Sequence, residues 1–239
     1  MKKFPKIVFS DFDGTLTEQG NFSPVFFDVL KIIQDKGAEL AIVTGRPLSW
    51  AHFLLTHFPI NCVITEGGGV VSEKNEIDFE DQFLVDKSEL DHLKNVEINL
   101  INGFPGIKLS EDSRCRVTDR AIDLTFLAQF GHEEEIEKFL LFNKINFSRS
   151  NVHLNFWSGK VSKKNAIEYY LNKKNILAEN CMYIGDSLND ESAFSAFDHC
   201  VGVSNINPII HKFRFPPKII LQGKENEEIL GVLNYLKSI

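Results

Sequence analysis

The sequence predicts an α/β fold, in which a Rossmann-like core with a parallel sheet carries an inserted α+β cap domain. Two observations indicate this. In the first and last thirds of the chain, short and continuously apolar segments alternate with segments of helical periodicity, whereas the middle third is charged and mixed in pattern. Strands that are apolar on both faces are typical of parallel sheets covered by helices. A segment of another style between two such parts indicates an inserted domain.

The first third contains the first elements of this core. Apolar runs at residues 6–10, 39–44 and 61–65 indicate buried strands. Between the first two runs, residues 24–36 have apolar side chains at helical spacing, with a proline at the start and a glycine just past the end. A strand, a helix and further strands in this order predict a parallel sheet.

The last third repeats the alternation of helices and strands. The segments in chain order are helix 163–171, strand 181–185, helix 187–197, strands 201–203 and 219–221, and helix 225–236. Because both ends of the chain share one style, we expect them to build a single sheet together.

The middle third forms the predicted cap. Its expected elements are helices at 88–93 and 133–142 and antiparallel strands at 106–109, 121–127 and 152–157. We therefore expect a core made from residues 1–80 and 158–239, with residues 81–157 inserted as the cap. A cap of this size can close over a small molecule, and it obstructs a protein substrate.

The composition limits the classes of function. The chain has 239 residues and a net charge of −7, so it lacks the Lys/Arg surplus with which non-specific nucleic-acid binders neutralise phosphates. No segment approaches the about 20 apolar residues that span a bilayer. The four cysteines show neither CxxC nor metal-ligand spacing, which favours free thiols in a reducing compartment. We expect a cytoplasmic monomer or homodimer without nucleic-acid or membrane partners.

Two carboxylates follow the first predicted strand. Residues 10–15 read SDFDGT, so Asp11 and Asp13 stand just beyond the carboxyl end of this strand, where open parallel sheets bind ligands. Two carboxylates this close repel each other unless a cation or a shared proton relieves them. For such a motif taken alone, a turn stabilised by aspartate is the ordinary alternative.

Two further strands end in polar residues. Residues 183–190 read YIGDSLND, which places Asp186 at the end of a strand and Asp190 one helical turn later. Another strand ends in Thr44, Gly45 and Arg46. Because the carboxyl ends of parallel strands meet at one edge of a sheet, we expect these groups to converge with the first carboxylates. Carboxylates suit Mg²⁺, and hydroxyl and N–H groups suit a phosphate.

The motifs DFDGT, TGR, a lysine and GDSLND, in this order, resemble the haloacid dehalogenase-like superfamily, whose phosphatases carry them across a Rossmann-like core. The insertion between the second motif and the lysine resembles the type IIB subgroup, which includes Cof-type and sucrose-phosphatase-like enzymes. The resemblance covers about residues 4–72 and 158–236. Many type IIB relatives have Asn-Gly after the third core strand, whereas this chain has Gly67 in place of the asparagine.

The resemblance implies a role for each motif residue. Asp11 resembles the nucleophile that forms an aspartyl-phosphate, and Asp13 resembles the general acid and base. The metal ligands implied by the resemblance are Asp11, Asp186 and the backbone carbonyl of Asp13. The residues expected to hold the phosphoryl group or support its ligands are Thr44, Gly45, Lys163, Asn189 and Asp190. For the lysine, Lys163 fits the family spacing and Lys160 is the alternative.

The cap offers weaker candidates for substrate contact. The strand 152–157 alternates in pattern, so one face could present His153, Asn155 and Trp157 toward the core, although a half-exposed strand explains the pattern equally well. Arg116, one of three neighbouring cap arginines, and Arg46 of the core suit recognition of an anion. Most surface arginines contact only solvent, so these two assignments are expectations.

Together these features predict a Mg²⁺-dependent phosphatase that hydrolyses a small phosphate monoester, a sugar or polyol phosphate, through an aspartyl-phosphate. A phosphomutase of the phosphomannomutase type is the alternative within enzymes, since such mutases share the superfamily and the cap style. A phospho-accepting signalling module is the alternative from another class. Such modules also use a strand-end aspartate, a threonine and a lysine, but they lack the second DxDGT carboxylate and the cap.

Overall fold

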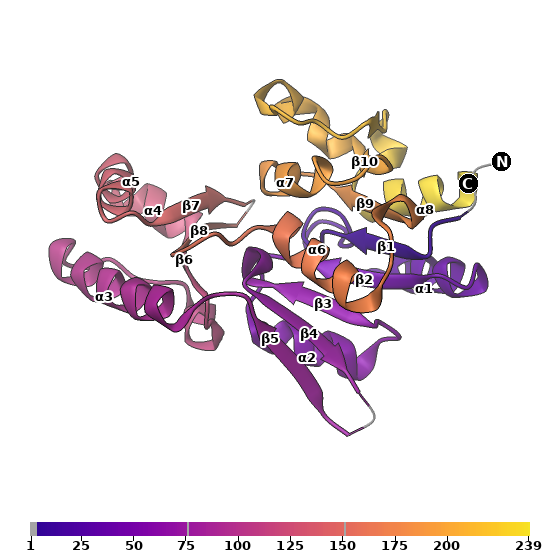
Figure 1. Ribbon diagram of the computed structural model, residues 1–239. Coiled ribbons are helices and arrows are strands. Elements are labelled where there is room, and N and C mark those ends of the chain that lie inside the picture. Colours follow the sequence, from indigo (N-terminus) through magenta and orange to yellow (C-terminus); the bar gives the residue numbers. More distant parts are fainter. Residues whose placement is uncertain (1–3, 76, 151) are drawn as a thin grey trace.

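The computed structural model describes residues 4–75, 77–150 and 152–239, and Figure 1 shows them arranged around two sheets. The larger sheet has eight strands: six pair in parallel, and the last two join this set through two successive antiparallel pairings. In sheet order they are β11 (Ile219–Ile220), β10 (Cys200–Gly202), β9 (Cys181–Gly185), β1 (Ile7–Ser10), β2 (Glu39–Val43), β3 (Cys62–Thr65), β4 (Val70–Lys74) and β5 (Phe79–Phe83).

Helices cover both faces of this sheet, which explains why its central strands are continuously apolar. Val8 of β1 packs in a core with the helices on one face, and its neighbours Ile7 and Phe9 pack in a second core on the other face. The helices of the first face are α1 (Val25–Asp35), α2 (Leu48–His57) and α8 (Glu228–Ser238), and those of the second are α6 (Lys163–Lys174) and α7 (Glu191–Phe194). The predicted α/β core is confirmed.

The smaller sheet belongs to the inserted segment and has the antiparallel order β6-β8-β7. Its strands and helices enclose a third apolar core around Ile122, Leu140 and Phe156. The elements are α3 (Lys87–Gly103), β6 (Asp119–Asp123), α4 (Leu124–Phe130), α5 (Glu133–Phe142), β7 (Asn146–Arg149) and β8 (His153–Trp157). Figure 1 shows this unit beside the carboxyl ends of the core strands.

Short 3₁₀ helices connect several of these elements. They are Glu66–Gly68, Glu111–Cys115, Ala178–Asn180, Leu188–Asp190, Ser204–Lys212 and Lys224–Asn226. The predicted helix 187–197 is one 3₁₀ turn followed by the short α7. In the part of the chain that the structure describes, no helix is long and apolar enough to cross a membrane.

The structure corrects several expected elements. Residues 106–109 form no strand, and the expected strand 121–127 ends at Asp123, whose side chain accepts a hydrogen bond from the N–H of Phe126 and begins α4. Helix α2, strand β7 and the hairpin of β4 and β5 were not predicted. Strand β5 is an edge strand of the sheet and is partly exposed. Its sequence is therefore polar and lacks the apolar pattern by which buried strands are recognised.

Strand β5 also crosses the predicted start of the cap at residue 81, because residues 81–83 pair with β4 of the larger sheet. The other predicted limit, residue 157, coincides with the end of β8. We propose that the inserted domain begins after β5 and ends with β8, and that the expected core from residues 1–80 and 158–239 extends to include β5.

Candidate active site

Asp11 and Asp186 lie side by side because their strands are neighbours. Strands β1 and β9 pair in parallel, with Ser10 opposite Ile184, and each aspartate follows the end of its strand. Both side chains are buried, and the strand residues that precede each aspartate are buried as well. Two distant motifs of the sequence therefore meet at one edge of the sheet, as the strand-end argument predicted.

Three carboxylates form a compact acidic cluster at this edge. Asp11, Asp186 and Asp190 each offer an oxygen, and these oxygens lie within 4.8 Å of one another. Asp186 accepts hydrogen bonds from the Thr15 hydroxyl at 3.3 Å and from the Asn205 amide at 2.9 Å. These contacts fix its orientation, and the cluster can hold a metal ion between hard oxygen ligands.

Lys163 is the cation of this cluster. It is the first residue of α6, whose preceding Ser162 caps the helix, and its side chain is 3% exposed. Its ammonium donates to Asp11 at 2.5 Å, to Asp190 at 2.6 Å and to the Asn189 side-chain oxygen at 3.2 Å. The alternative Lys160 is exposed, whereas Lys163 contacts the carboxylates directly.

Burial and charge act against each other in this cluster. Burial raises the pKa of the Asp11 carboxyl well above its ordinary value, and the Lys163 ammonium opposes that rise. Burial also acts to lower the pKa of Lys163, but the carboxylates of Asp11 and Asp190 outweigh it and raise that pKa. The lysine thus stays charged, and it favours an ionised Asp11.

Asp190 is held from several sides. One carboxylate oxygen accepts from Lys163 and from the phenol of Tyr183 at 2.5 Å, and the other accepts from the N–H groups of Asp186 and Ser187, each at 3.0 Å. Asp190 is fully buried. Its contacts fit the expected supporting role, in which it orients the lysine and the turn that carries Asp186.

Asp13 lies outside the three-carboxylate cluster and pairs with Arg46. The guanidinium binds both carboxylate oxygens, at 2.9 and 2.6 Å, and lies over the Trp50 ring at 4.8 Å from its centre. This pair accounts for the side chain of Asp13, so only its backbone carbonyl remains as the expected metal ligand. Arg46 was expected to contact substrate, and it lines the pocket described next.

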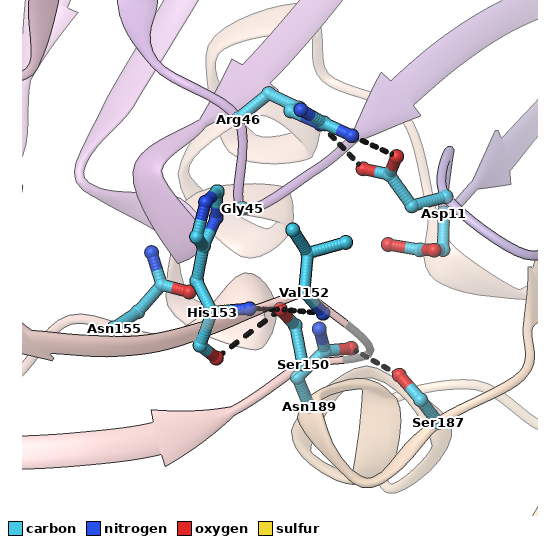
Figure 2. A pocket seen from close by; sticks show the side chains of 10 residues that line it. Asp11, Gly45, Arg46, Ser150, Val152, His153, Asn155, Ser187 and Asn189 are labelled. Atoms are coloured by element: carbon cyan, nitrogen blue, oxygen red, sulfur yellow. Dashed lines mark hydrogen bonds and ion pairs between the residues drawn. The ribbon is translucent and has the colours of Figure 1, made fainter. Parts of the chain in front are cut away.

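Core and cap together line a small pocket, shown in Figure 2. The core contributes the two aspartates of the first motif and the Gly45–Arg46 turn, and the cap contributes the beginning of β8. The full lining comprises Asp11, Asp13, Gly45, Arg46, Ser150, Val152, His153, Asn155, Ser187 and Asn189. The expected convergence of His153 and Asn155 on the core is therefore observed. A second cavity shares Gly45, Asn155 and Asn189 and extends to Trp157 and Lys163.

Thr44 directly follows β2, the strand that leads to this pocket, and its hydroxyl oxygen accepts from the N–H of Arg46 at 3.1 Å. The contact folds residues 44–46 into a turn next to the carboxylates. Gly45 also faces the cap, since a Cβ placed on it would lie 4.0 Å from the Asn155 side-chain oxygen. Hydroxyl and backbone N–H groups of such a turn are suited to phosphoryl oxygens.

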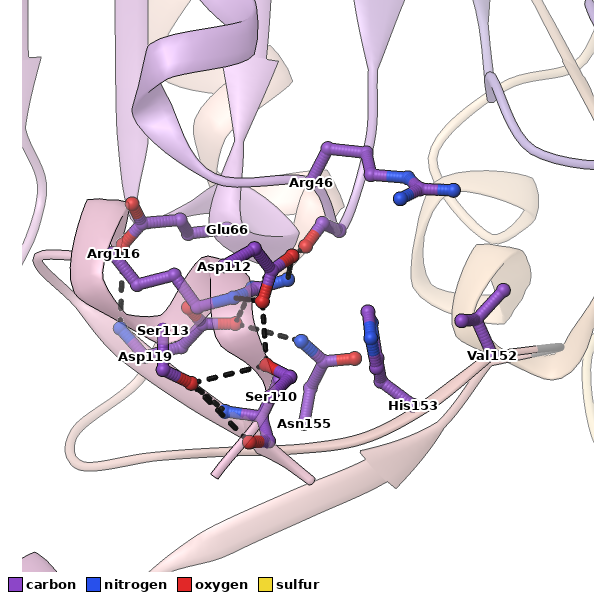
Figure 3. Close-up of polar contacts among 12 residues, drawn as sticks. Arg46, Glu66, Ser110, Asp112, Ser113, Arg116, Asp119, Val152, His153 and Asn155 are labelled. Carbon is purple, nitrogen blue, oxygen red and sulfur yellow. Dashed lines mark hydrogen bonds and ion pairs between the residues drawn. The ribbon is translucent and has the colours of Figure 1, made fainter. Parts of the chain in front are cut away.

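The structure corrects the expectation for Arg116. Its guanidinium is fully buried and binds Asp112 and Asp119, and it also donates to the Gly45 carbonyl at 2.9 Å. Figure 3 shows this network, in which Asp119 in turn accepts from the Asn155 amide at 3.0 Å. Arg116 thus joins the cap to the core, and its donors face these groups, not the pocket.

Sequence reasoning missed four polar residues at the site. Thr15 and Asn205 hold Asp186, and both follow strand ends, so the strand-end argument could have found them. Tyr183 stands inside an apolar strand, where nothing in the sequence distinguishes it from a packing residue. Glu66 follows β3 and binds the cap through its carboxylate. Its position directly after a strand could have marked it as a candidate site residue, whereas no sequence pattern predicted its partners in the cap.

A sequence profile of the haloacid dehalogenase-like hydrolases matches residues 8–103 and 106–214, which include every motif described above. The chain belongs to this family. The hydrolase is 27% identical over 207 residues to the phosphoglycolate phosphatase of Methanobrevibacter smithii, covering 84% of this chain and 87% of that one. Family and relative together identify the protein as a phosphatase. Haloacid dehalogenase-like hydrolases generally use a metal ion, which agrees with the acidic cluster.

Solved structures of the family share the fold of this hydrolase. The sucrose-phosphatase of Synechocystis sp. PCC6803 superposes with a TM-score of 0.66 at 17% identity, covering 100% of this chain and 98% of that one. A sugar phosphatase of subclass IIB superposes with a TM-score of 0.70 at 16% identity, covering 98% of this chain and 100% of that one. The predicted architecture, a Rossmann-like core with an inserted cap, is confirmed.

Proposed function

We propose that this phosphatase hydrolyses a small phosphate monoester with the aid of Mg²⁺, through an aspartyl-phosphate formed on Asp11. The observation that carries the proposal is the 2.5 Å contact between Asp11 and Lys163 beside Asp186, at a pocket lined by core and cap. A carboxylate that attacks an anionic phosphoryl group meets like-charge repulsion, and the ammonium offsets it. Asp11 is thus equipped as the nucleophile.

The chain's own residues support a two-step reaction. An oxygen of Asp11 forms a bond to phosphorus while the bond from phosphorus to the leaving oxygen breaks, and Asp13, which enters this step released from Arg46 and protonated from solvent, gives that oxygen its proton. In the second step Asp13 takes a proton from water, whose oxygen attacks phosphorus. The bond to Asp11 breaks, inorganic phosphate leaves and both aspartates are restored. Lys163 and the turn at Thr44 hold the phosphoryl oxygens, with Asn189 beside the lysine.

The residues present fit a magnesium ion. Asp11 and Asp186 offer carboxylate oxygens, and the backbone carbonyl of Asp13 completes the proposed protein ligands. Asp190 is assigned to support, since its oxygens already accept from Lys163, a phenol and two N–H groups. Mg²⁺ prefers oxygen ligands and commonly takes one or two carboxylates together with phosphate and water. When bound, the ion supplies positive charge that stabilises the transferring phosphoryl group.

We infer two candidate substrate classes from the residues that line the pocket. A sugar or polyol phosphate matches the expectation from the type IIB resemblance and the polar cap residues His153 and Asn155. A small phosphorylated acid such as phosphoglycolate is favoured by the name of the Methanobrevibacter relative and by Arg46, whose guanidinium suits a carboxylate. The same pocket thus offers a cation for an acid and hydrogen-bonding groups for hydroxyls.

Phosphate release from a panel of esters tests this proposal. The panel includes phosphoglycolate and sugar and polyol phosphates, each measured with Mg²⁺, with EDTA, and with Mg²⁺ restored. We expect turnover that EDTA abolishes and Mg²⁺ restores, and full activity after exhaustive chelation would contradict the metal assignment. Formation of an isomeric phosphate ester without phosphate release would favour the phosphomutase alternative. Membership of a hydrolase family already decides against the signalling module.

A further inference from the structure

The turn at residues 66–69 lies where the core, the cap and helix α6 meet. Glu66 opens this turn with a backbone φ of +53°, a left-handed conformation that strains a residue with a Cβ and suits glycine. Three glycines follow it, so the turn has glycine everywhere except at this strained position. The Glu66 side chain is nevertheless buried, at 1% exposure. A buried carboxylate kept at such a position must have partners that hold it there.

Those partners come mainly from the cap. One oxygen of Glu66 accepts from the Thr118 N–H at 2.5 Å, the Thr118 hydroxyl at 2.7 Å and the Val117 N–H at 3.0 Å. The other oxygen accepts from the N–H of Leu48, the first residue of α2, at 3.1 Å. A single core carboxylate therefore binds the chain entering β6 of the cap and a helix of the core. Hydrogen bonds to a charged acceptor are among the strong ones in proteins.

The backbone of the same turn holds the second motif. The Glu66 N–H donates to the Arg46 carbonyl at 3.0 Å, and the Gly67 N–H donates to the Thr44 carbonyl at 3.1 Å. These two bonds fix the turn that carries the proposed phosphate-binding groups. The position of the cap and the position of that turn are thus tied to one residue.

The glycines of the turn bring it into direct contact with two further segments. A Cβ on Gly69 would lie 1.9 Å from the Thr118 hydroxyl oxygen of the cap. A Cβ on Gly68 would lie 2.3 Å from the Ser162 carbonyl, directly before Lys163. Both glycines allow backbone approaches that no other residue permits without a shift. The turn is consequently packed between the cap and the start of the helix that carries the lysine.

We propose that Glu66 is a positioning residue for the phosphatase reaction, which locks the cap over the site in register with the Thr44–Arg46 turn and Lys163. This inference rests on the proposed function. A closed cap excludes water, and electrostatic interactions among the enclosed groups are then stronger. Groups that bind the transferring phosphoryl must also be held in place, since a small misplacement is costly. Glu66 does not line the pocket of Asp11, but it lines the neighbouring cavity that reaches Lys163, and its carboxylate is held by the cap and α2.

The test compares Glu66→Gln and Glu66→Gly with the wild-type enzyme. Glu66→Gln keeps the shape of the side chain but replaces one of its two accepting oxygens with an NH₂ group, which cannot accept from the facing N–H groups. Glu66→Gly removes the side chain at a position whose positive φ suits glycine. We expect kcat to fall about tenfold or more with KM almost unchanged, because groups that act in the transition state are displaced. Amide hydrogen exchange at Val117 and Thr118 should become faster, while amides of β8 keep their protection.

Glu73→Gln is the matched control. Glu73 is also a buried carboxylate of the core, and it pairs with Lys173 and Lys174 on α6, far along that helix from Lys163. Kinetics are measured well below the melting temperatures of all variants. Equal kinetic losses in Glu73→Gln and Glu66→Gln would reduce Glu66 to a stabilising residue and overturn the proposal. Wild-type kinetics in both Glu66 variants, or unchanged amide exchange at Val117 and Thr118 in both, would also overturn the proposal. A wild-type protein that hydrolyses no ester would instead overturn the proposed function.

Discussion

Arg46 binds both carboxylate oxygens of Asp13, and the pair closes one side of the pocket that contains Asp11. A guanidinium in this parallel arrangement matches carboxylate and phosphate alike. We therefore expect an anionic ester that enters the pocket to compete with Asp13 for Arg46. On this proposal the freed Asp13 carboxyl takes up from solvent the proton that it then donates, and Arg46 pairs with the substrate instead.

We expect Arg46→Lys to raise KM by about tenfold, roughly 1.4 kcal/mol, because an ammonium cannot bind two oxygens in the same planar geometry. Steady-state kinetics on the best substrate of the panel measure this. Arg120→Lys is the control, since Arg120 pairs with Glu97 within the cap and does not line the pocket. A KM increase of the same size in both variants would argue against substrate contact by Arg46.

Asp11→Asn should abolish turnover and keep the fold. The amide has nearly the same shape, but it is not a nucleophile and is a poor metal ligand. It also removes one of three carboxylates crowded within 4.8 Å, so no loss of folding is expected from charge. Phosphate release and circular dichroism are measured on the same sample. A folded Asp11→Asn protein with near-normal turnover would contradict the assignment of the nucleophile.

Lys163→Met should lower kcat by about 10²–10³-fold, as expected when one group that stabilises transition-state charge is removed. The methionine keeps the length of the side chain and leaves Asp11 and Asp190 without their shared cation. Lys160→Met is the matched control on the exposed neighbour, and its kcat should stay near that of the wild type. The reverse order of the two effects would show that the motif lysine is Lys160.

His153 should make stability depend on pH. Burial lowers its pKa below the ordinary value of 6.5, with opposing effects from Asp112 and Asp123 and further lowering by Arg116 and Arg46. Below pH 6.5 the unfolded chain therefore protonates this imidazole more readily than the folded protein does. The contribution of His153 to the free energy of unfolding is fully present above pH 6.5 and is lost progressively as the pH falls below it. Denaturant unfolding at a series of pH values measures this slope.

His153→Gln removes the titrating group and keeps a polar side chain of similar length. The variant should lose stability less steeply between neutral pH and pH 5 than the wild type does. The difference between the two curves isolates His153 from the many carboxylates that titrate at lower pH. Identical slopes in both proteins would mean that the folded state does not resist protonation of this imidazole.

Much of the catalytic half of the site could be predicted from sequence. Asp11, Asp186 and Thr44 each follow a short apolar run, and the carboxyl ends of parallel strands must meet at one edge. Local order along the chain therefore implies that they share one end of the sheet, whereas the pairing of β1 with β9 and β2, which brings them close, is seen only in the structure. The α/β class and the inserted cap followed from the same periodicity. The edge hairpin of β4 and β5 did not, because an exposed edge strand has no buried face to leave a pattern.

The contacts between core and cap were decided by tertiary structure alone. Arg116 was expected to bind substrate, yet it is buried against Asp112 and Asp119 and reaches the Gly45 carbonyl. Glu66 offered a sequence signal only in its place after a strand, and its partners at 117–119 lie about fifty residues further along the chain. The sequence by itself determined which strand ends carry the proposed catalytic groups, because buried parallel strands and the polar residues just after them can be recognised from local periodicity. Which charged side chains bind the substrate and which bind the other domain depends on how two separately folded surfaces meet, and no local pattern encodes that.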